Sequence, residues 1–164
     1  MKIGLVSDSH GKADRQSRAV RELVDRGAEA IVHCGDLGSS ECVRALGAAG
    51  VPSWATAGNM DRHSPHLGEV AAHSGVTFGC RRVELDLGDG RRLVAVHGHD
   101  EALLEALISG GRFAYVCHGH THRRRDEHVG PVHVVNPGAV QRATPHSAAL
   151  LDTDSDTVTF LDFD

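Results

Sequence analysis

Residues 2–10 read KIGLVSDSH, and this stretch decides the fold. A short apolar run, the pattern of a buried strand, ends at Ser7 and is followed by Asp8 and His10. In an extended segment, side chains two residues apart face the same side, so the Asp8 carboxylate and the His10 imidazole can share one ion. The same pattern, a strand that ends in metal-ligand residues, recurs further along the chain.

Two more such strands follow, with helices between them. Apolar runs at residues 29–34 and 51–57 end just before Asp36 and Asn59. Helices are predicted at residues 14–26 and from Ser39 or Ser40 to residue 49. This alternation predicts a parallel sheet with right-handed connections. The loops that carry the three motifs then lie along one edge of the sheet, where α/β sheets bind ligands.

The second half of the chain is richer in strands. Alternating apolar and polar residues at 81–87 and 91–96 flank a Gly-Asp-Gly turn and predict an antiparallel hairpin. A helix is expected at residues 101–108 with Asp100 as its cap. Runs at 113–117, 132–135, 148–152 and 158–163 predict a second sheet, with its last two strands paired through residues 153–156. Residues 62–79 predict a surface connection with one short helix.

Histidine motifs end two strands of the second half. His97 and His99 follow the hairpin, and a His-Gly-His-Thr-His run from residue 118 to 122 follows the strand at 113–117. One motif of this kind is usually turn chemistry, whereas five of them after five strands indicate one shared site. The candidate donors exceed what one tetrahedral zinc needs and suit two metal ions. They are Asp8, His10, Asp36, Asn59, His97, His120 and His122.

In order along the chain, the motifs are Asp-x-His, Gly-Asp, Gly-Asn-x-Asp, His-Gly-His and Gly-His-Thr-His. They resemble the signature of the calcineurin-like binuclear metallophosphoesterases, and the short chain is most similar to the small prokaryotic phosphodiesterases of that family. A loop of the family also resembles Asn136-Pro137-Gly138. The resemblance implies an α/β fold, a four-layer sandwich of two mixed sheets flanked by helices. The length of 164 residues predicts a single domain over residues 1–164.

The resemblance also implies a ligand set. One metal is expected on Asp8, His10, Asp36 and His122, and a second on Asn59, His97, His120 and the shared Asp36. A hydroxide that bridges the two ions would attack phosphorus in line. Mixed imidazole and oxygen ligands favour divalent transition ions, with manganese expected first and nickel, iron, cobalt or zinc as alternatives.

One position departs from the pattern of larger phosphatases in this superfamily. Their Gly-Asn-x-Asp motif carries at x a histidine that protonates the leaving oxygen, whereas this chain has Met60. A thioether cannot donate a proton, so we expect activity on phosphodiesters or activated esters and weak monoesterase activity. The expected catalytic residues are Asp36, Asn59 and, as substitute acid, His99; His63 is a weaker candidate acid. Asp61 is expected to fix its loop by hydrogen bonds.

The remaining histidines have no predicted role in catalysis. His33 and His118 lie within strands beside the motifs and are expected to be packed or to orient ligands. The others are predicted at surface or strand positions: His66, His73, His128, His133 and His146. Three of the four cysteines, Cys34, Cys42 and Cys117, lie in or beside apolar runs and are predicted to be buried thiols.

The balance of charged residues limits the kinds of partner that this protein is expected to bind. With 17 Lys and Arg against 22 Asp and Glu, the formal net charge is −5, which argues against a protein that coats nucleic acid. Two divalent ions would still leave the site locally positive for a phosphate ester. Arg123-Arg124-Arg125 is predicted either to steer that substrate or to be a solvated loop balanced by Asp126 and Glu127.

We therefore expect a hydrolase that acts on a small phosphodiester or nucleotide-like substrate. No leader or apolar span is visible, which predicts a cytoplasmic protein without a membrane partner. Nucleic acid is a poor fit as a partner, and a homo-oligomer stays open. The alternative is a non-catalytic protein-interaction scaffold of the same fold, the role of a retromer subunit. The complete donor set favours the enzyme, because a scaffold has no need of it.

Overall fold

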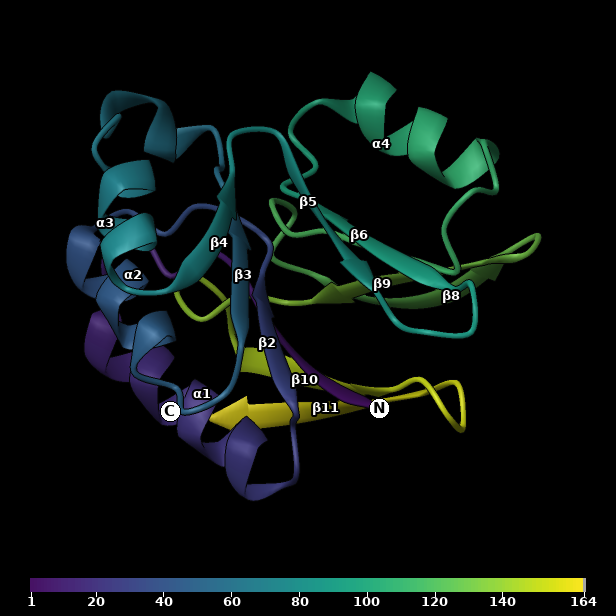
Figure 1. The fold of residues 1–164 in the computed structure, drawn as a ribbon, viewed down its shortest axis with the longest axis horizontal. Coiled ribbons are helices and arrows are strands. Elements are labelled where there is room, and N and C mark those ends of the chain that lie inside the picture. Colours follow the sequence, from purple (N-terminus) through teal and green to yellow (C-terminus); the bar gives the residue numbers. More distant parts are fainter. Residues whose placement is uncertain (164) are drawn as a thin grey trace.

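The computed structural model describes residues 1–163, and the elements alternate as the first half of the sequence predicts (Figure 1). In the first half they are β1 (Lys2–Val6), α1 (Ala13–Asp25), β2 (Ala30–His33), α2 (Ser40–Gly47), β3 (Ser53–Thr56), the 3-10 helix η1 (Met60–His63), α3 (Leu67–His73) and β4 (Val76–Gly79). In the second half they are β5 (Arg82–Asp86), β6 (Arg92–Val96), α4 (Glu101–Ser109), β7 (Tyr115–Cys117), β8 (Arg124–Val129), β9 (Val132–Pro137), β10 (His146–Asp152) and β11 (Thr157–Phe163).

The strands form two mixed sheets. The first sheet has the order β11-β10-β1-β2-β3-β4, in which β1 to β4 are parallel and β10 is antiparallel to β1. The second has the order β5-β6-β7-β9-β8, in which β6, β7 and β9 are parallel and the two edge strands are antiparallel. In Figure 1, α1, α2 and α3 cover one face of the first sheet and α4 covers the outer face of the second. The predicted four-layer sandwich is confirmed.

Three hydrophobic clusters fill the spaces between these four layers. Neighbouring strand residues divide between clusters because successive side chains point to opposite faces. Ile31 packs under α1 and α2, whereas Val32 belongs to the cluster between the sheets. In the same way Leu93 faces the first sheet and Val94 packs with the residues of α4. This alternation fixes which face of each strand is internal.

The predicted helix starts are confirmed by their caps. The Ser39 hydroxyl accepts a hydrogen bond from the Cys42 N–H, and the Asp100 carboxylate accepts one from the Leu103 N–H at 3.1 Å. Both side chains satisfy a backbone donor that has no partner within its helix. Each helix therefore begins at a fixed residue next to a loop that carries site residues.

Three predictions about elements are wrong. Residues 148–152 and 158–163 belong to the first sheet, because β10 pairs with β1 through Ile3 and Leu151. Residues 62–79 are more than a surface connection, since β4 extends the parallel sheet. The Arg123–125 run is not a loop: Arg124 and Arg125 lie in edge strand β8, where they pair with Asp162 and Glu127.

Within residues 1–163, no helix is long and apolar enough to cross a membrane.

Candidate metal centre

The predicted donors meet at one edge of the sandwich. Strands of the first sheet precede Asp8, His10, Asp36 and Asn59. In the second sheet, β6 precedes His97, and β7 precedes His120 and His122. Across the boundary between the sheets, the His122 Nε2 lies 3.2 Å from Asp8 Oδ1, and the His97 Nε2 lies 3.4 Å from Asp36 Oδ2. The centre is thus assembled from two sheets that pack against each other.

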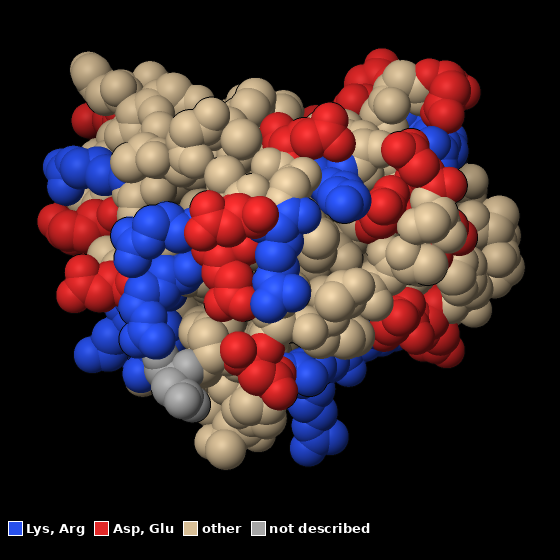
Figure 2. Space-filling model, turned by 90° about the horizontal axis from the view of Figure 1, so that it is seen from below, with Lys and Arg blue, Asp and Glu red and all other residues tan. Residues whose placement is uncertain are grey.

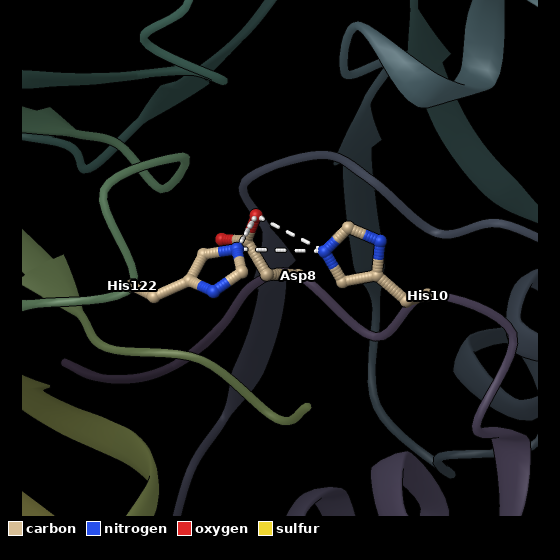
Figure 3. A group of neighbouring side chains, drawn as sticks. All are labelled: Asp8, His10 and His122. Carbon is tan, nitrogen blue, oxygen red and sulfur yellow. Dashed lines mark hydrogen bonds and ion pairs between the residues drawn. The ribbon is translucent and has the colours of Figure 1, made fainter. Parts of the chain in front are cut away.

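One half of the centre consists of Asp8, His10 and His122 (Figure 3). The two imidazoles point toward each other beside the carboxylate, with their Nε2 atoms 3.4 Å apart. The Asp8 Oδ1 lies 3.8 Å from the His10 Nε2. Two imidazole nitrogens and one carboxylate oxygen directed at one point form a donor set that suits a divalent transition ion.

The other half consists of Asp8, Asp36 and His97, whose donor atoms also lie within 4.8 Å of one another. Asn59 belongs here, because its Oδ1 lies 3.1 Å from the His97 Nε2. The His120 ring lies 5.1 Å from the His97 ring, centroid to centroid, and its side chain is exposed. All seven predicted donors are therefore brought to one place.

Asp36 lies between the two halves. Its Oδ2 is 3.4 Å from the His97 Nε2 and 3.9 Å from the His10 Nε2, so one carboxylate oxygen faces a ligand from each half. The other oxygen accepts a hydrogen bond from the Met60 N–H at 2.9 Å. Burial raises the pKa of Asp36, but the nearby His97 side chain and this N–H outweigh it, and the pKa is lowered overall. The ionised carboxylate is the favoured form.

A buried oxygen of Asp8 shows that a cation fits this centre. Asp8 Oδ2 accepts hydrogen bonds from the Ser7 hydroxyl at 2.6 Å and from the His120 N–H at 3.0 Å. Asp8 Oδ1 is buried and has no hydrogen-bond partner. A buried anionic oxygen without a partner is costly unless a positive charge faces it. The Oδ1 atom is directed at the histidine Nε2 atoms, where a metal ion would satisfy it.

Backbone carbonyls fix two of the histidines in the tautomer that binds metals. The His97 Nδ1 lies 2.9 Å from the Cys34 carbonyl oxygen, and the His122 Nδ1 lies 3.1 Å from the Arg142 carbonyl oxygen. A carbonyl only accepts, so Nδ1 must carry the proton and donate it. In the neutral form of each ring, Nε2 then has the lone pair that a metal ion would bind. A carbonyl on the far nitrogen is the usual outer contact of a histidine ligand.

The backbone at the centre is strained. Eight non-glycine residues have positive φ, and five of them are predicted donors: Asp8, His10, Asp36, His120 and His122. Such conformations are rare for residues with a Cβ and persist where the surrounding structure enforces them. The strain therefore coincides with the candidate ligands.

Two glycines let the loops approach closely. A Cβ on Gly119 would lie 2.6 Å from Asp8 Oδ2 and would collide with the Ser7 hydroxyl. A Cβ on Gly58 would overlap the Asp36 carboxylate. Neither glycine has a positive φ, so each is required for space rather than for backbone freedom. The Gly-Asn and Gly-His motifs thus have a packing reason.

Asp61 fixes its loop, as the sequence predicts. Its carboxylate accepts hydrogen bonds from the backbone N–H groups of Leu37, Gly38 and Gly58, at 2.8–3.1 Å. The Asp61 side chain is buried, and none of these three hydrogen bonds involves the side chain of a candidate metal ligand. It therefore ties the loop after β3 to the loop that carries Asp36.

His33 and His118 are buried, as expected. Burial lowers the pKa of His33 to about 3, and that of His118 to about 4. The His33 Nδ1 accepts from the Gly35 N–H, so its Nε2 donates to the Ser9 hydroxyl at 2.8 Å. His33 is neutral and holds together the loops after β1 and β2.

Asn136 is a positioning residue whose role the sequence did not reveal. Its Nδ2 donates to the Gly119 carbonyl at 2.9 Å and to the Thr121 hydroxyl at 3.1 Å, and its Oδ1 accepts from the Gly138 N–H. These bonds hold the loop that carries His120 and His122. In the sequence, the Asn-Pro-Gly motif marks this position, but it does not indicate which groups Asn136 contacts.

A pocket of about 350 Å³ opens beside His97. Its walls include Phe78, Pro65 and Leu103, and Arg62 and His99 also line it. The His99 ring lies 5.5 Å from the His97 ring, and burial together with the positive charge of its neighbours lowers the pKa of His99. Met60 is 48% exposed. The pocket joins an apolar wall to the metal-ligand residues.

Comparison with known proteins identifies the family. A model of the calcineurin-like phosphoesterase superfamily domain matches residues 1–156. The phosphodiesterase MJ0936 from Methanocaldococcus jannaschii is 32% identical over 141 residues, which cover 84% of this chain and 83% of that protein.

Solved structures share the fold over the full length. One, described as a novel archaeal phosphodiesterase, has a TM-score of 0.90 and 28% identity and covers 99% of this chain and 100% of its own. YfcE, a phosphoesterase from E. coli, has a TM-score of 0.71 at 21% identity, with both chains fully covered, and is similar in fold alone. With the motifs, the two-sheet centre and the family match in agreement, the chain belongs to the calcineurin-like phosphoesterase superfamily.

Proposed function

We propose that this protein is a metal-dependent phosphodiesterase that hydrolyses a small phosphodiester at the centre between its two sheets. The buried Asp8 Oδ1, which has no hydrogen-bond partner within residues 1–163 and lies among imidazole nitrogens, carries the proposal, because a cation bound there would satisfy it. The phosphodiesterase MJ0936 and the archaeal phosphodiesterase structure support the reaction class. Residues 1–164 act as one domain in this proposal.

We infer that the donors would divide as the family resemblance implies. Asp8, His10, Asp36 and His122 would hold one ion, and Asn59, His97, His120 and the shared Asp36 would hold the other. When bound, two divalent ions supply Lewis acidity and an ionised water for in-line attack on phosphorus. Manganese is the proposed ion, with nickel, iron, cobalt and zinc as alternatives for this mixed donor set.

The chain's own residues position the substrate. Asp36 faces ligands of both halves, and the Met60 N–H holds its second oxygen away from them. The Asn59 amide donates to a phosphoryl oxygen. His99 lines the pocket beside the centre and is the proposed proton donor to the leaving oxygen. Since Met60 cannot donate a proton, diesters and activated esters are preferred over alkyl monoesters.

The pocket beside His97 indicates where the organic part of the substrate binds. Phe78, Pro65 and Leu103 give it an apolar surface, and Arg62 adds a positive charge. An aromatic or nucleoside-like group fits this combination. Long nucleic acids fit less well, because the formal net charge is −5. The face shown in Figure 2 carries positive and negative side chains side by side.

Hydrolysis of a nitrophenyl phosphodiester and of the matching monoester tests the proposal. Protein stripped with a chelator receives manganese, nickel, iron, cobalt, zinc or magnesium singly. We expect metal-dependent turnover with the diester favoured. Asp36→Asn should lower it by several orders of magnitude with an unchanged circular dichroism spectrum, and Asp25→Asn, an exposed residue in α1, should match the wild type.

One result would contradict the role of Asp36 and another would contradict the enzyme. Turnover that survives in Asp36→Asn would remove the bridging carboxylate from the reaction. Binding of two ions without turnover of either ester by any metal form would favour the interaction scaffold.

A further inference from the structure

A second cluster of metal-ligand side chains lies at the opposite edge of the sandwich. His128 on β8 and His133 on β9 are directly opposed in the antiparallel ladder, so their side chains share a face. Asp156 reaches them from the β10–β11 turn of the other sheet. His133 lies at the start of β9, whereas the candidate ligands of the metal centre follow the ends of strands.

The donor atoms of this cluster converge. One ligand atom from each of the three side chains lies within 4.8 Å of the other two. The His128 Nε2 lies 2.9 Å from Asp156 Oδ2, and the His133 Nδ1 lies 2.8 Å from Asp156 Oδ1. The imidazole rings stack with centroids 4.0 Å apart. Two nitrogens and a carboxylate therefore surround one point.

Neighbouring groups hold these donors in place. The other nitrogen of His133, Nε2, lies 2.6 Å from Asp126 Oδ1, and the Tyr115 hydroxyl donates to Asp156 Oδ1 at 3.0 Å. A carboxylate on the far nitrogen is the contact that orients a histidine ligand and makes its near nitrogen a better donor. The His133 side chain is only 3% exposed, whereas those of His128 and Asp156 are 55% and 49% exposed, so the site has one buried ligand and opens to solvent on the other side.

The charge of the cluster also suits a cation. Asp126 and Asp156 carry two negative charges, and their ion-pair partners within residues 1–163 are histidines alone. With neutral histidines, one divalent ion balances both carboxylates. Two imidazoles and one carboxylate, with an exposed side left for water, favour zinc over calcium or magnesium, which prefer oxygen donors.

We propose that His128, His133 and Asp156 form a separate structural site that binds one Zn²⁺ ion and joins the two sheets at the edge remote from the metal centre. The β8–β9 hairpin belongs to the second sheet and Asp156 to a turn of the first, so the ion would add coordination bonds between elements that hydrogen bonds of Asp156 already join. This site is independent of the phosphodiesterase proposal, because it shares no residue with that centre.

Zinc titration of the full chain tests the site. The background is Asp36→Asn, which weakens the metal centre, and isothermal titration calorimetry measures each zinc equivalent. We expect one zinc-binding event that His128→Ala or Asp156→Asn weakens at least about 100-fold and that Asp126→Asn weakens about 10- to 100-fold through the orientation of His133. His73→Ala, an exposed histidine of α3, is the matched control and should change nothing.

Two further readouts separate the site from a loss of folding. In the Asp36→Asn background, Co²⁺ bound in place of zinc should give the visible absorption of a tetrahedral ion, and adding His128→Ala should remove that absorption. In the unsubstituted background, His128→Ala should keep its manganese-dependent diesterase activity. Equal zinc affinity and stoichiometry in the background protein and its His128→Ala form would overturn the proposal, and so would the absence of any zinc event that depends on these residues.

Discussion

At the scale of single residues, local motifs pointed to the candidate donors that the structure brings together. Asp8, Asp36 and His97 each follow a strand, and a position just after a strand is encoded within a few residues of sequence. The sequence does not indicate which groups orient these donors. The tautomers of His97 and His122 depend on the carbonyls of Cys34 and Arg142, and a backbone carbonyl has the same chemistry in every residue.

Met60 offers the sharpest residue-scale prediction. Met60→His places a proton donor on an exposed position of the loop that carries Asn59, so we expect the ratio of monoester to diester turnover to rise about tenfold or more. Met60→Leu, which changes shape without adding a donor, should leave the ratio unchanged. Steady-state kinetics on a paired alkyl monoester and diester measure it, and equal ratios in both variants would refute the explanation.

His99 has a distinct kinetic signature if it donates the proton. His99→Ala should lower kcat strongly for diesters with poor alkyl leaving groups and little for nitrophenyl esters, because a good leaving group needs no acid. His63→Ala, on η1, serves as the comparison. An equal loss on both ester types would assign His99 to substrate binding or packing.

The close packing around Gly119 predicts that one added methyl group lowers the stability of the protein. In Gly119→Ala, the new Cβ would press on Ser7 and Asp8, so we expect a loss of about 1–3 kcal/mol of unfolding free energy and weaker metal binding. Gly68→Ala in α3, where a Cβ meets only Phe78 at 3.7 Å, should be neutral or stabilising. Urea denaturation with and without manganese compares the two, and equal effects would contradict the packing argument.

At the scale of elements, regular patterns were predicted, and two of the four edge strands, β4 and β8, were missed. Strand β8 is charged and mostly exposed, so it lacks the alternation that marks a half-buried strand, and charge is a common feature of edges. Strand β4 has only four residues and follows a helix that the sequence barely shows. The pairing of β10 with β11 was predicted correctly, but the two strands were assigned to the wrong sheet, because alternation reveals that one face is buried but not against which sheet.

The Asp61 bonds give an element-scale prediction. Asp61→Ala removes the acceptor of three backbone N–H groups in two loops, so we expect a loss of about 2–4 kcal/mol of unfolding free energy and a weaker metal centre. Asp25→Ala, an exposed residue at the end of α1, should change stability by less than about 0.5 kcal/mol. Chemical denaturation of both variants measures the difference, and a small effect in Asp61→Ala would show that water replaces the carboxylate.

At the scale of the whole molecule, metal content should set stability. The carboxylates of Asp8 and Asp36 are buried in the same group of candidate ligands. Ions bound at this centre would neutralise them, and only in the folded state. Free metal at 100 times its Kd should add about 2.7 kcal/mol per site, so chelation should lower Tm by several degrees. Differential scanning fluorimetry measures this shift, which Asp36→Asn should reduce; identical Tm values with and without metal would contradict it.

Because the candidate ligands come from both sheets, metal uptake depends on how the two halves of the chain come together. The His120 backbone N–H donates to the Asp8 carboxylate, although the two residues are 112 positions apart in sequence. A fragment that contains the first four strands carries four of the seven candidate donors, and a fragment with the later strands carries the other three. Neither fragment holds the complete set, so we expect tight metal uptake to require correct docking of the two sheets, and mixing two complementary fragments should restore metal loading and activity together.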